Sequence, residues 1–377
     1  MFNKKKLFTT TLGISLISLC AYGAEIKADI KKENKDTDVL VTFGLGGLKA
    51  DSEINTANSM GVGIDAHVLH NLSSSLQARI SAGMNVQTGS SSSARDNNIY
   101  APSNGNHLKE ALIAYTPIEL IELEAGVVNQ SFLEAPMVVD KKGFIAAKQK
   151  FTYKVLDTRF SLLASQAIPN NRNLSQKINV NDEGDPRFFA ETFRVEQELF
   201  VGKAKLDLTH YAYDNISNSV AYESILLGNT GSPIDKGNGK LANSYNGWNA
   251  DLKYDFDFSN NMNLGFNANY IINSAANENN TGFRAGAKLS YASGDSKYSV
   301  ELENFSLDAD ASVAYYNSSR YGMANKAGNR IRIEYHNVTS ALKVGAEAIS
   351  NKVINENIYQ SDETVILFSL RKTYDLF

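Results

Sequence analysis

An alternation of apolar and polar residues with a period of two, repeated along nearly the whole chain, most constrains the fold. One early example has the apolar set Met60, Val62, Ile64, Ala66 and Val68, with small or polar residues between its members. Successive side chains of a β-strand point to opposite faces, so this pattern predicts strands with one apolar and one polar face. An amphipathic helix would instead repeat about every 3.6 residues.

The same alternation recurs in about sixteen segments of 11 to 15 residues. These segments are residues 37–48, 58–71, 75–88, 106–116, 119–129, 143–155, 157–168, 186–200, 202–214, 244–258, 261–274, 280–292, 296–308, 326–337, 340–351 and 362–376. A tilted strand needs about 9–11 residues to cross the hydrocarbon core of a membrane. The segments are therefore long enough to span it.

The connections between these segments alternate between short and long. Long connections are predicted at 49–57, 89–105, 130–142, 169–185, 215–243, 309–325 and 352–361, with a shorter one near 274–279. Bacterial barrels have short turns on the periplasmic side and longer loops outside. The fold class predicted is all-β: a transmembrane antiparallel up-and-down β-barrel of about 16 strands, with short periplasmic turns and long extracellular loops.

The N-terminus carries a targeting pattern. Lys4, Lys5 and Lys6 precede an apolar and hydroxyl-rich stretch, and Gly23 closes a possible cleavage site of small residues. This pattern predicts a signal peptide over residues 1–23. The domains expected after it are a periplasmic extension over 24–36 and the barrel over 37–377. A lipoprotein modification of Cys20, the single cysteine, is the alternative.

Composition excludes several functional classes. No run of about 20 apolar residues follows the first twenty positions, which excludes helical membrane spans. Loss of the three signal lysines takes the formal net charge from −4 to −7, which argues against a nucleic-acid partner. The motifs HExxH, CxxC and GxSxG do not occur. We therefore predict no enzymatic activity, no metal site and no cofactor.

The polar faces of the predicted strands carry many charges. The basic residues predicted to face the lumen are Arg79, Lys148, Lys150, Arg284, Lys288, Arg330 and Arg332. Acids on the same faces include Glu122, Glu124, Glu301, Glu303 and Glu334. Buried charges are costly unless they are paired, whereas a water-filled channel accommodates them. An open lumen with mild ion selectivity is predicted, and a lumen closed by packed ion pairs is the alternative.

This layout resembles the general trimeric porins of Gram-negative bacteria over nearly the whole chain after the signal peptide. The resemblance implies a homotrimer in outer-membrane lipid through which small polar solutes and ions diffuse. In that family the loop after the fifth strand folds into the barrel and sets the constriction, and here it would place Glu134 and Asp140 there. The family sets such acids against basic residues of the first strands, where this chain offers only Arg79.

Two other functions stay open from the sequence. One is a substrate-selective outer-membrane channel for a sugar or an organic anion. Residues 25–36 are too few to form a plug domain, so selectivity would come from a site within the lumen. The other is a surface barrel without a transport role, such as an adhesin.

Overall fold

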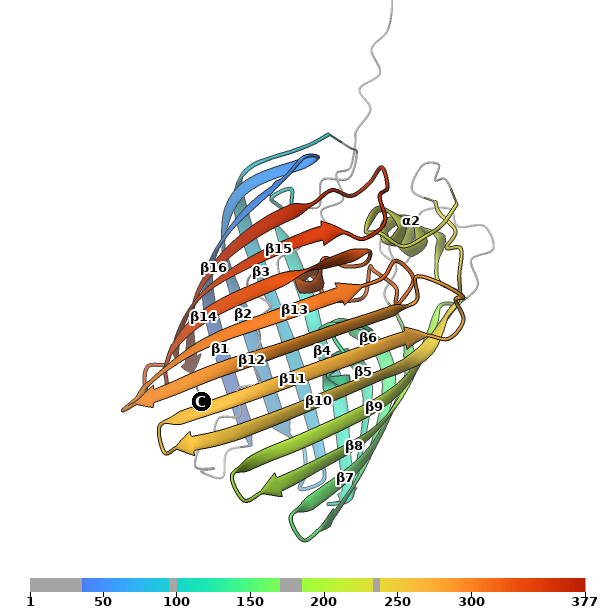
Figure 1. Cartoon of the computed structure of the whole chain (residues 1–377). Helices are drawn as coiled ribbons and strands as arrows, with labels where there is room; N and C mark the ends of the chain where they lie inside the picture. Colours follow the sequence, from blue (N-terminus) through green and yellow to red (C-terminus); the bar gives the residue numbers. More distant parts are fainter. Residues whose placement is uncertain (1–35, 95–99, 170–184, 233–237, 377) are drawn as a thin grey trace, which may run out of the picture.

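In the computed structural model, which describes residues 36–94, 100–169, 185–232 and 238–376, the chain forms a closed antiparallel barrel (Figure 1). Each strand pairs with its neighbours in the sequence, and β1 pairs with β16 to close the ring. The predicted signal peptide, 1–23, and nearly all of the predicted extension, 24–36, lie outside the described residues.

The barrel has sixteen strands. They are β1 (Thr37–Ser52), β2 (Asn55–Asn71), β3 (Leu76–Ser93), β4 (Gly105–Ile118), β5 (Ile121–Asn129), β6 (Gly143–Val155), β7 (Thr158–Ile168), β8 (Arg187–Leu199), β9 (Gly202–Asp214), β10 (Tyr245–Ser259), β11 (Met262–Asn273), β12 (Thr281–Ser293), β13 (Ser296–Leu307), β14 (Lys326–Asn337), β15 (Leu342–Val353) and β16 (Glu363–Asp375). The predicted fold and strand number are confirmed.

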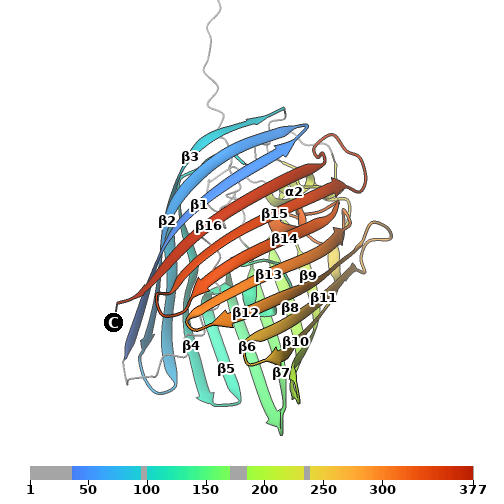
Figure 2. The same ribbon diagram turned by 60° about the vertical axis from the view of Figure 1, so that its left-hand side comes forward.

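One predicted loop is wrong. Residues 49–57 were expected to form a long connection, but β1 continues to Ser52 and β2 begins at Asn55. The pairing of Asp51 with Thr56 shows that the ladder runs on through polar residues, because backbone pairing does not require an apolar face. As a result, β1, β2 and β3 extend beyond β14 and β15 at the end that carries the helix α2 (Figure 2).

The two faces of the wall differ as the alternation predicts. Met60, Val62, Phe266 and Ile333 point outward and are about half exposed. Charged and polar side chains occupy the alternate positions, where Asp251 and Arg330 are only 2% exposed. Among the described residues, no helix is long and apolar enough to cross a membrane.

The connection between β9 and β10 contains a helix that the sequence analysis did not predict. Helix α2 (Asn218–Leu226) begins after Ser217, whose hydroxyl accepts a hydrogen bond from the amide of Val220. Val220, Ala221 and Ile225 are buried. The helix lies at the end of the barrel opposite the C-terminus (Figure 1).

Gly126 in β5 tests how closely neighbouring strands approach one another. Its φ is +134°, and a Cβ there would lie 2.3 Å from the carbonyl oxygen of Ala111. We expect Gly126→Ala to lower the free energy of unfolding by about 1–3 kcal/mol, since the backbone is strained and the adjacent strand must move. The measurement is denaturant unfolding followed by the fluorescence of Trp248, the single tryptophan.

Gly105 provides the matched control for this substitution. A Cβ on Gly105 would meet only Asn85 Oδ1 at 3.6 Å, an ordinary contact. Gly105→Ala should leave the unfolding midpoint unchanged. Equal effects of the two alanines would contradict the close approach of β5 to β4.

Candidate functional site in the barrel lumen

The connection after β5 folds into the barrel instead of extending outward. It begins with a short 3-10 helix, η1 (Gln130–Leu133), whose first turn is capped by the Asn129 side chain. Leu133, Met137 and Val138 are completely buried, which an exposed loop would not allow. Residues 130–142 are called the first inward loop below.

A second inward loop, residues 308–325 between β13 and β14, lies against the first. Val313 and Ala314 are completely buried. The amide of Asp140 donates to the carbonyl of Tyr316 at 3.0 Å, and the amide of Ser318 donates to the carbonyl of Pro136 at 2.9 Å. The two loops therefore form one hydrogen-bonded unit within the barrel.

Tyrosines of β9 fix both loops to the wall. The Tyr211 hydroxyl donates to the carbonyl of Ala311 at 2.7 Å, and the Tyr213 hydroxyl donates to the carbonyl of Val138 at 3.1 Å. The rings of Tyr213 and Tyr316 are stacked, 5.3 Å apart and 8° from parallel. Buried tyrosines with paired hydroxyls pack tightly, so these loops are rigid elements of the lumen.

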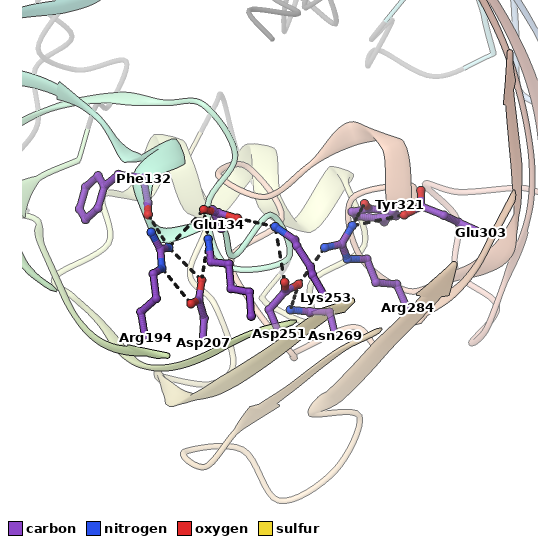
Figure 3. Close-up of polar contacts among 11 residues, drawn as sticks. Phe132, Glu134, Arg194, Asp207, Asp251, Lys253, Asn269, Arg284, Glu303 and Tyr321 are labelled. Carbon is purple, nitrogen blue, oxygen red and sulfur yellow. Dashed lines mark hydrogen bonds and ion pairs between the residues drawn. The ribbon is translucent and has the colours of Figure 1, made fainter. Parts of the chain in front are cut away.

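Glu134 links the first inward loop to the charged wall. Its carboxylate forms ion pairs with Lys205 on β9 and Lys253 on β10 and lies 3.4 Å from Arg194 on β8. Figure 3 shows Arg194 and Lys253 approaching Glu134 from the wall. Burial alone would raise the pKa of Glu134, but the three cations outweigh it and lower the pKa to about 2.

The ion pairs continue along the wall on both sides of Glu134. Arg194 makes two hydrogen bonds of 2.8 Å to Asp207 (Figure 3). On the other side, Arg284 lies 2.8 Å from Asp251 and 3.3 Å from Glu303. The row goes on through β14 and β15, where the pairs are Arg330 with Glu303, Arg330 with Glu347 and Arg332 with Glu334. Acids and bases alternate from β8 to β15.

A second cluster covers β3, β5 and β6. Glu124 accepts from Arg79 at 2.8 Å and from Lys148 at 3.0 Å. Glu122 lies 3.5 Å from Arg79 and 3.6 Å from Lys150. Arg79, Lys148 and Lys150 are thus neutralised locally by the acids of β5.

The structure brings most of the predicted lumen cations into these two clusters and separates one. Arg284, Arg330 and Arg332 belong to the wall row. Lys288 lies apart, in a cleft near the turns that it shares with Glu334. Asp140 lies at the end of the first inward loop, where its amide anchors the second.

Several charged residues of the lumen were missed from the sequence. Lys205 and Lys253 alternate with apolar outward residues, so the period of two could have identified them. Lys109 faces inward to pair with Asp65 at 2.6 Å, but the pairing of β3 with β4 is irregular there, and this irregularity breaks the alternation. The sequence did indicate that the second inward loop is buried. Its many alanines and tyrosines make it unusually apolar for an exposed connection.

A cleft remains between the second inward loop and the wall of β1, β14, β15 and β16. It is narrow, with a cavity volume of about 60 Å³, and it opens to solvent. Tyr100, Ser319 and Glu363 also line an adjacent cleft toward the outer loops. The cleft near the turns is larger, about 360 Å³, and is lined by Lys288, Glu334 and His336 among others.

Comparisons with solved structures identify the fold. OccK5 (OpdH) of Pseudomonas aeruginosa is 8% identical with a TM-score of 0.50, over 91% of this chain and 99% of that chain. A mutant of OmpT, an outer membrane protein of Vibrio cholerae, that lacks loop L8 is 8% identical with a TM-score of 0.51, over 90% and 100%. OprB of Pseudomonas putida at low pH is 6% identical with a TM-score of 0.50, over 90% and 92%.

At these identities the likeness shows a shared fold, and the transmembrane-type barrel fold expected from the sequence is confirmed. No protein-family model and no curated protein matches the chain. The roles of individual lumen residues therefore rest on the geometry above.

Glu134→Gln should make the lumen more selective for anions. The substitution removes the negative charge shared by Arg194, Lys205 and Lys253, and the lumen gains net positive potential. The measurement is the zero-current potential in a KCl gradient across a planar bilayer. We expect a shift toward the chloride equilibrium potential.

Glu198→Gln is the control, since Glu198 is largely exposed beside Lys203 at the end of β8. It should leave the zero-current potential unchanged. An unchanged potential in Glu134→Gln would mean that Glu134 does not face the ion path.

Proposed function

We propose that this chain is an outer-membrane channel of a Gram-negative bacterium through which small hydrophilic solutes and ions diffuse. The observation that carries the proposal is the closed barrel with an apolar outer face and a charged inner face. Side chains such as Met60 and Ile333 are suited to hydrocarbon, while a lumen with this many charges requires water or ion partners.

The clefts support a route for solutes along one side of the lumen. Two adjoining clefts line the wall from the outer loops to Arg332, and another begins at Glu334 near the turns. Arg332 and Glu334 are two residues apart on β14 and form an ion pair. A route past this pair would join the two adjoining clefts to the cleft near the turns.

The expected partners of the protein follow from the same proposal. Outer-membrane lipid would contact the apolar face, and small polar solutes and ions would occupy the lumen. Homotrimerisation is carried over from the resemblance to trimeric porins, and the fold shared with an outer membrane protein of Vibrio cholerae supports the location.

A substrate-selective channel is the second candidate, and the second inward loop favours it. Two loops fixed to the wall, one through Tyr211 and the other through Tyr213, occupy more of the lumen than one constriction loop would. A narrow lumen with a defined cleft can discriminate between solutes by their contacts as well as by their size.

Conductance tests the proposed function directly. The refolded protein, added to a planar bilayer in KCl, should insert in steps and give a constant current increment. The control is the same sample after heat denaturation. Repeated trials without steps, from protein whose circular dichroism shows a folded β-barrel, would contradict the proposal.

Shortening the second inward loop should widen the lumen. We expect replacement of residues 309–324 by a short Gly-Ser linker to raise the single-channel conductance, because the buried segment occupies the barrel interior. The matched control replaces the exposed Asn277 and Glu278 by glycine and should leave the conductance unchanged. An equal conductance in both variants would show that residues 309–324 do not restrict the path.

A further inference from the structure

Three basic side chains on adjacent strands lie directly opposite one another near the turns. Lys297 on β13 is in register with His336 on β14, and His336 is in register with Lys343 on β15. Lys297 and His336 alternate with outward residues such as Tyr298 and Ile333, so they face the lumen. Directly opposite side chains have Cβ atoms about 4.5–5.5 Å apart, and one small anion can therefore contact two of these groups.

Lys288 on β12 belongs to the same group. Lys343 is close enough to Lys288 to be repelled by it, and His336 is repelled in the same way by Lys297 and by Lys343. Lys288, Lys297 and His336 line the cleft near the turns, at the end of the barrel that holds the C-terminus (Figure 1). Lys288, Lys297, His336 and Lys343 are called the turn-side basic cluster below.

Positive charge exceeds negative charge in this cluster. Within the described part of the chain, its three lysines form no hydrogen bond and no ion pair. Of the two acids that line the cleft, Glu334 forms an ion pair with Arg332 of the wall row. The other acid, Asp257, accepts a hydrogen bond from Asn263 at 2.9 Å. One carboxylate without a cationic partner thus stands near three lysines.

The nearest acid of β13 is also engaged elsewhere. Glu301 faces Lys288 across the pairing of β12 with β13, but its carboxylate lies 3.6 Å from Arg330 of the wall row. Like charges in direct register destabilise a sheet, and a bound anion would relieve the repulsion between Lys297, His336 and Lys343.

The cleft supplies space and polar groups beside these charges. Its volume is about 360 Å³, which is within the range of small-molecule sites. Ser290 on β12 and Ser299 on β13 lie directly opposite each other and line it, each two residues from a lysine of the cluster. Asn260 and Asn261 of the turn after β10 add amide groups. A solute with hydroxyl groups next to an anionic group would find partners for both.

We propose that the turn-side basic cluster binds a phosphate group, free or carried by a small hydroxylated molecule. Ammonium groups suit phosphate because each is a point charge with three donors. His336 contributes an N–H donor whether or not it is protonated. A monovalent carboxylate carries less charge and fewer acceptor oxygens, so it binds more weakly. This inference rests on the proposed channel function and names a class of solute for its turn-side mouth.

Current block by inorganic phosphate tests the site. In planar bilayers in dilute KCl, which limits the screening of exposed charges, phosphate should reduce the wild-type current saturably, and acetate should reduce it less. Lys297→Gln and Lys343→Gln should each raise the apparent Kd for phosphate about threefold, and the double substitution about tenfold. Lys203→Gln is the matched control, because Lys203 is an exposed lysine at another turn, where it pairs with Glu198. It should leave the Kd unchanged.

Glycerol 3-phosphate distinguishes a phosphate ester from free phosphate. Contacts between its hydroxyl groups and the two serines should make its apparent Kd lower than that of inorganic phosphate. Substitution of both Ser290→Ala and Ser299→Ala should remove this difference and leave the block by inorganic phosphate unchanged. Equal Kd values for the two probes in the wild type would show that the site takes the phosphate group alone.

The outcomes separate this inference from the function on which it rests. Absence of any current contradicts the channel itself. Normal KCl steps without saturable phosphate block, acetate block as strong as phosphate block, or an equal rise of Kd in Lys203→Gln contradict the phosphate site alone. Block is measured as a fraction of each variant's own current, so changes in conductance do not enter. The charge-retaining Lys297→Arg and Lys343→Arg should keep the wild-type Kd and remain informative if a glutamine variant does not fold.

Discussion

The hydrogen bonding of the backbone is the constraint on which the rest of this structure depends. In hydrocarbon, every amide and carbonyl must find a partner within the protein, and a sheet with free edges cannot satisfy that requirement. Pairing of β1 with β16, from Leu40 with Asp375 to Ser52 with Glu363, removes both edges. A closed wall then separates lipid outside from water inside. Apolar and polar residues therefore alternate with a period of two along each strand.

The width of the barrel explains what fills it. Sixteen strands enclose more space than inward side chains of the wall can fill, so other parts of the chain or water must occupy the interior. Two loops enter, and Tyr211, Tyr213 and Glu134 fix them to the wall. The loops pack against β8, β9 and β10. One remaining cleft lies along β14, β15, β16 and β1, and another lies near the turns of β10 to β14.

The sequence predicted the wall better than the interior. Alternation depends on neighbours within one strand, so nearly all strand bounds could be predicted to within a few residues. The exceptions were the hairpin of β1 and β2 and the end of β3, which continues to Ser93, because their polar ends carry no alternation. Loop positions depend on contacts between distant residues, such as Asp140 with Tyr316, and no local pattern encodes those contacts. The resemblance to trimeric porins pointed to Glu134, but its partners on β8, β9 and β10 came only from the structure.

The assignment of neighbouring side chains to lipid and to water can be measured on one strand. Ser299 lines the cleft near the turns, whereas Val300, its neighbour on β13, points outward. In proteoliposomes of the processed protein, a cysteine at position 299 should react with a charged, membrane-impermeant thiol reagent. A cysteine at 300 should resist the reagent, and a fluorophore attached there should be quenched by brominated lipid chains. Equal labelling at both positions, or lipid quenching at 299, would contradict a water-filled lumen inside a lipid-facing wall.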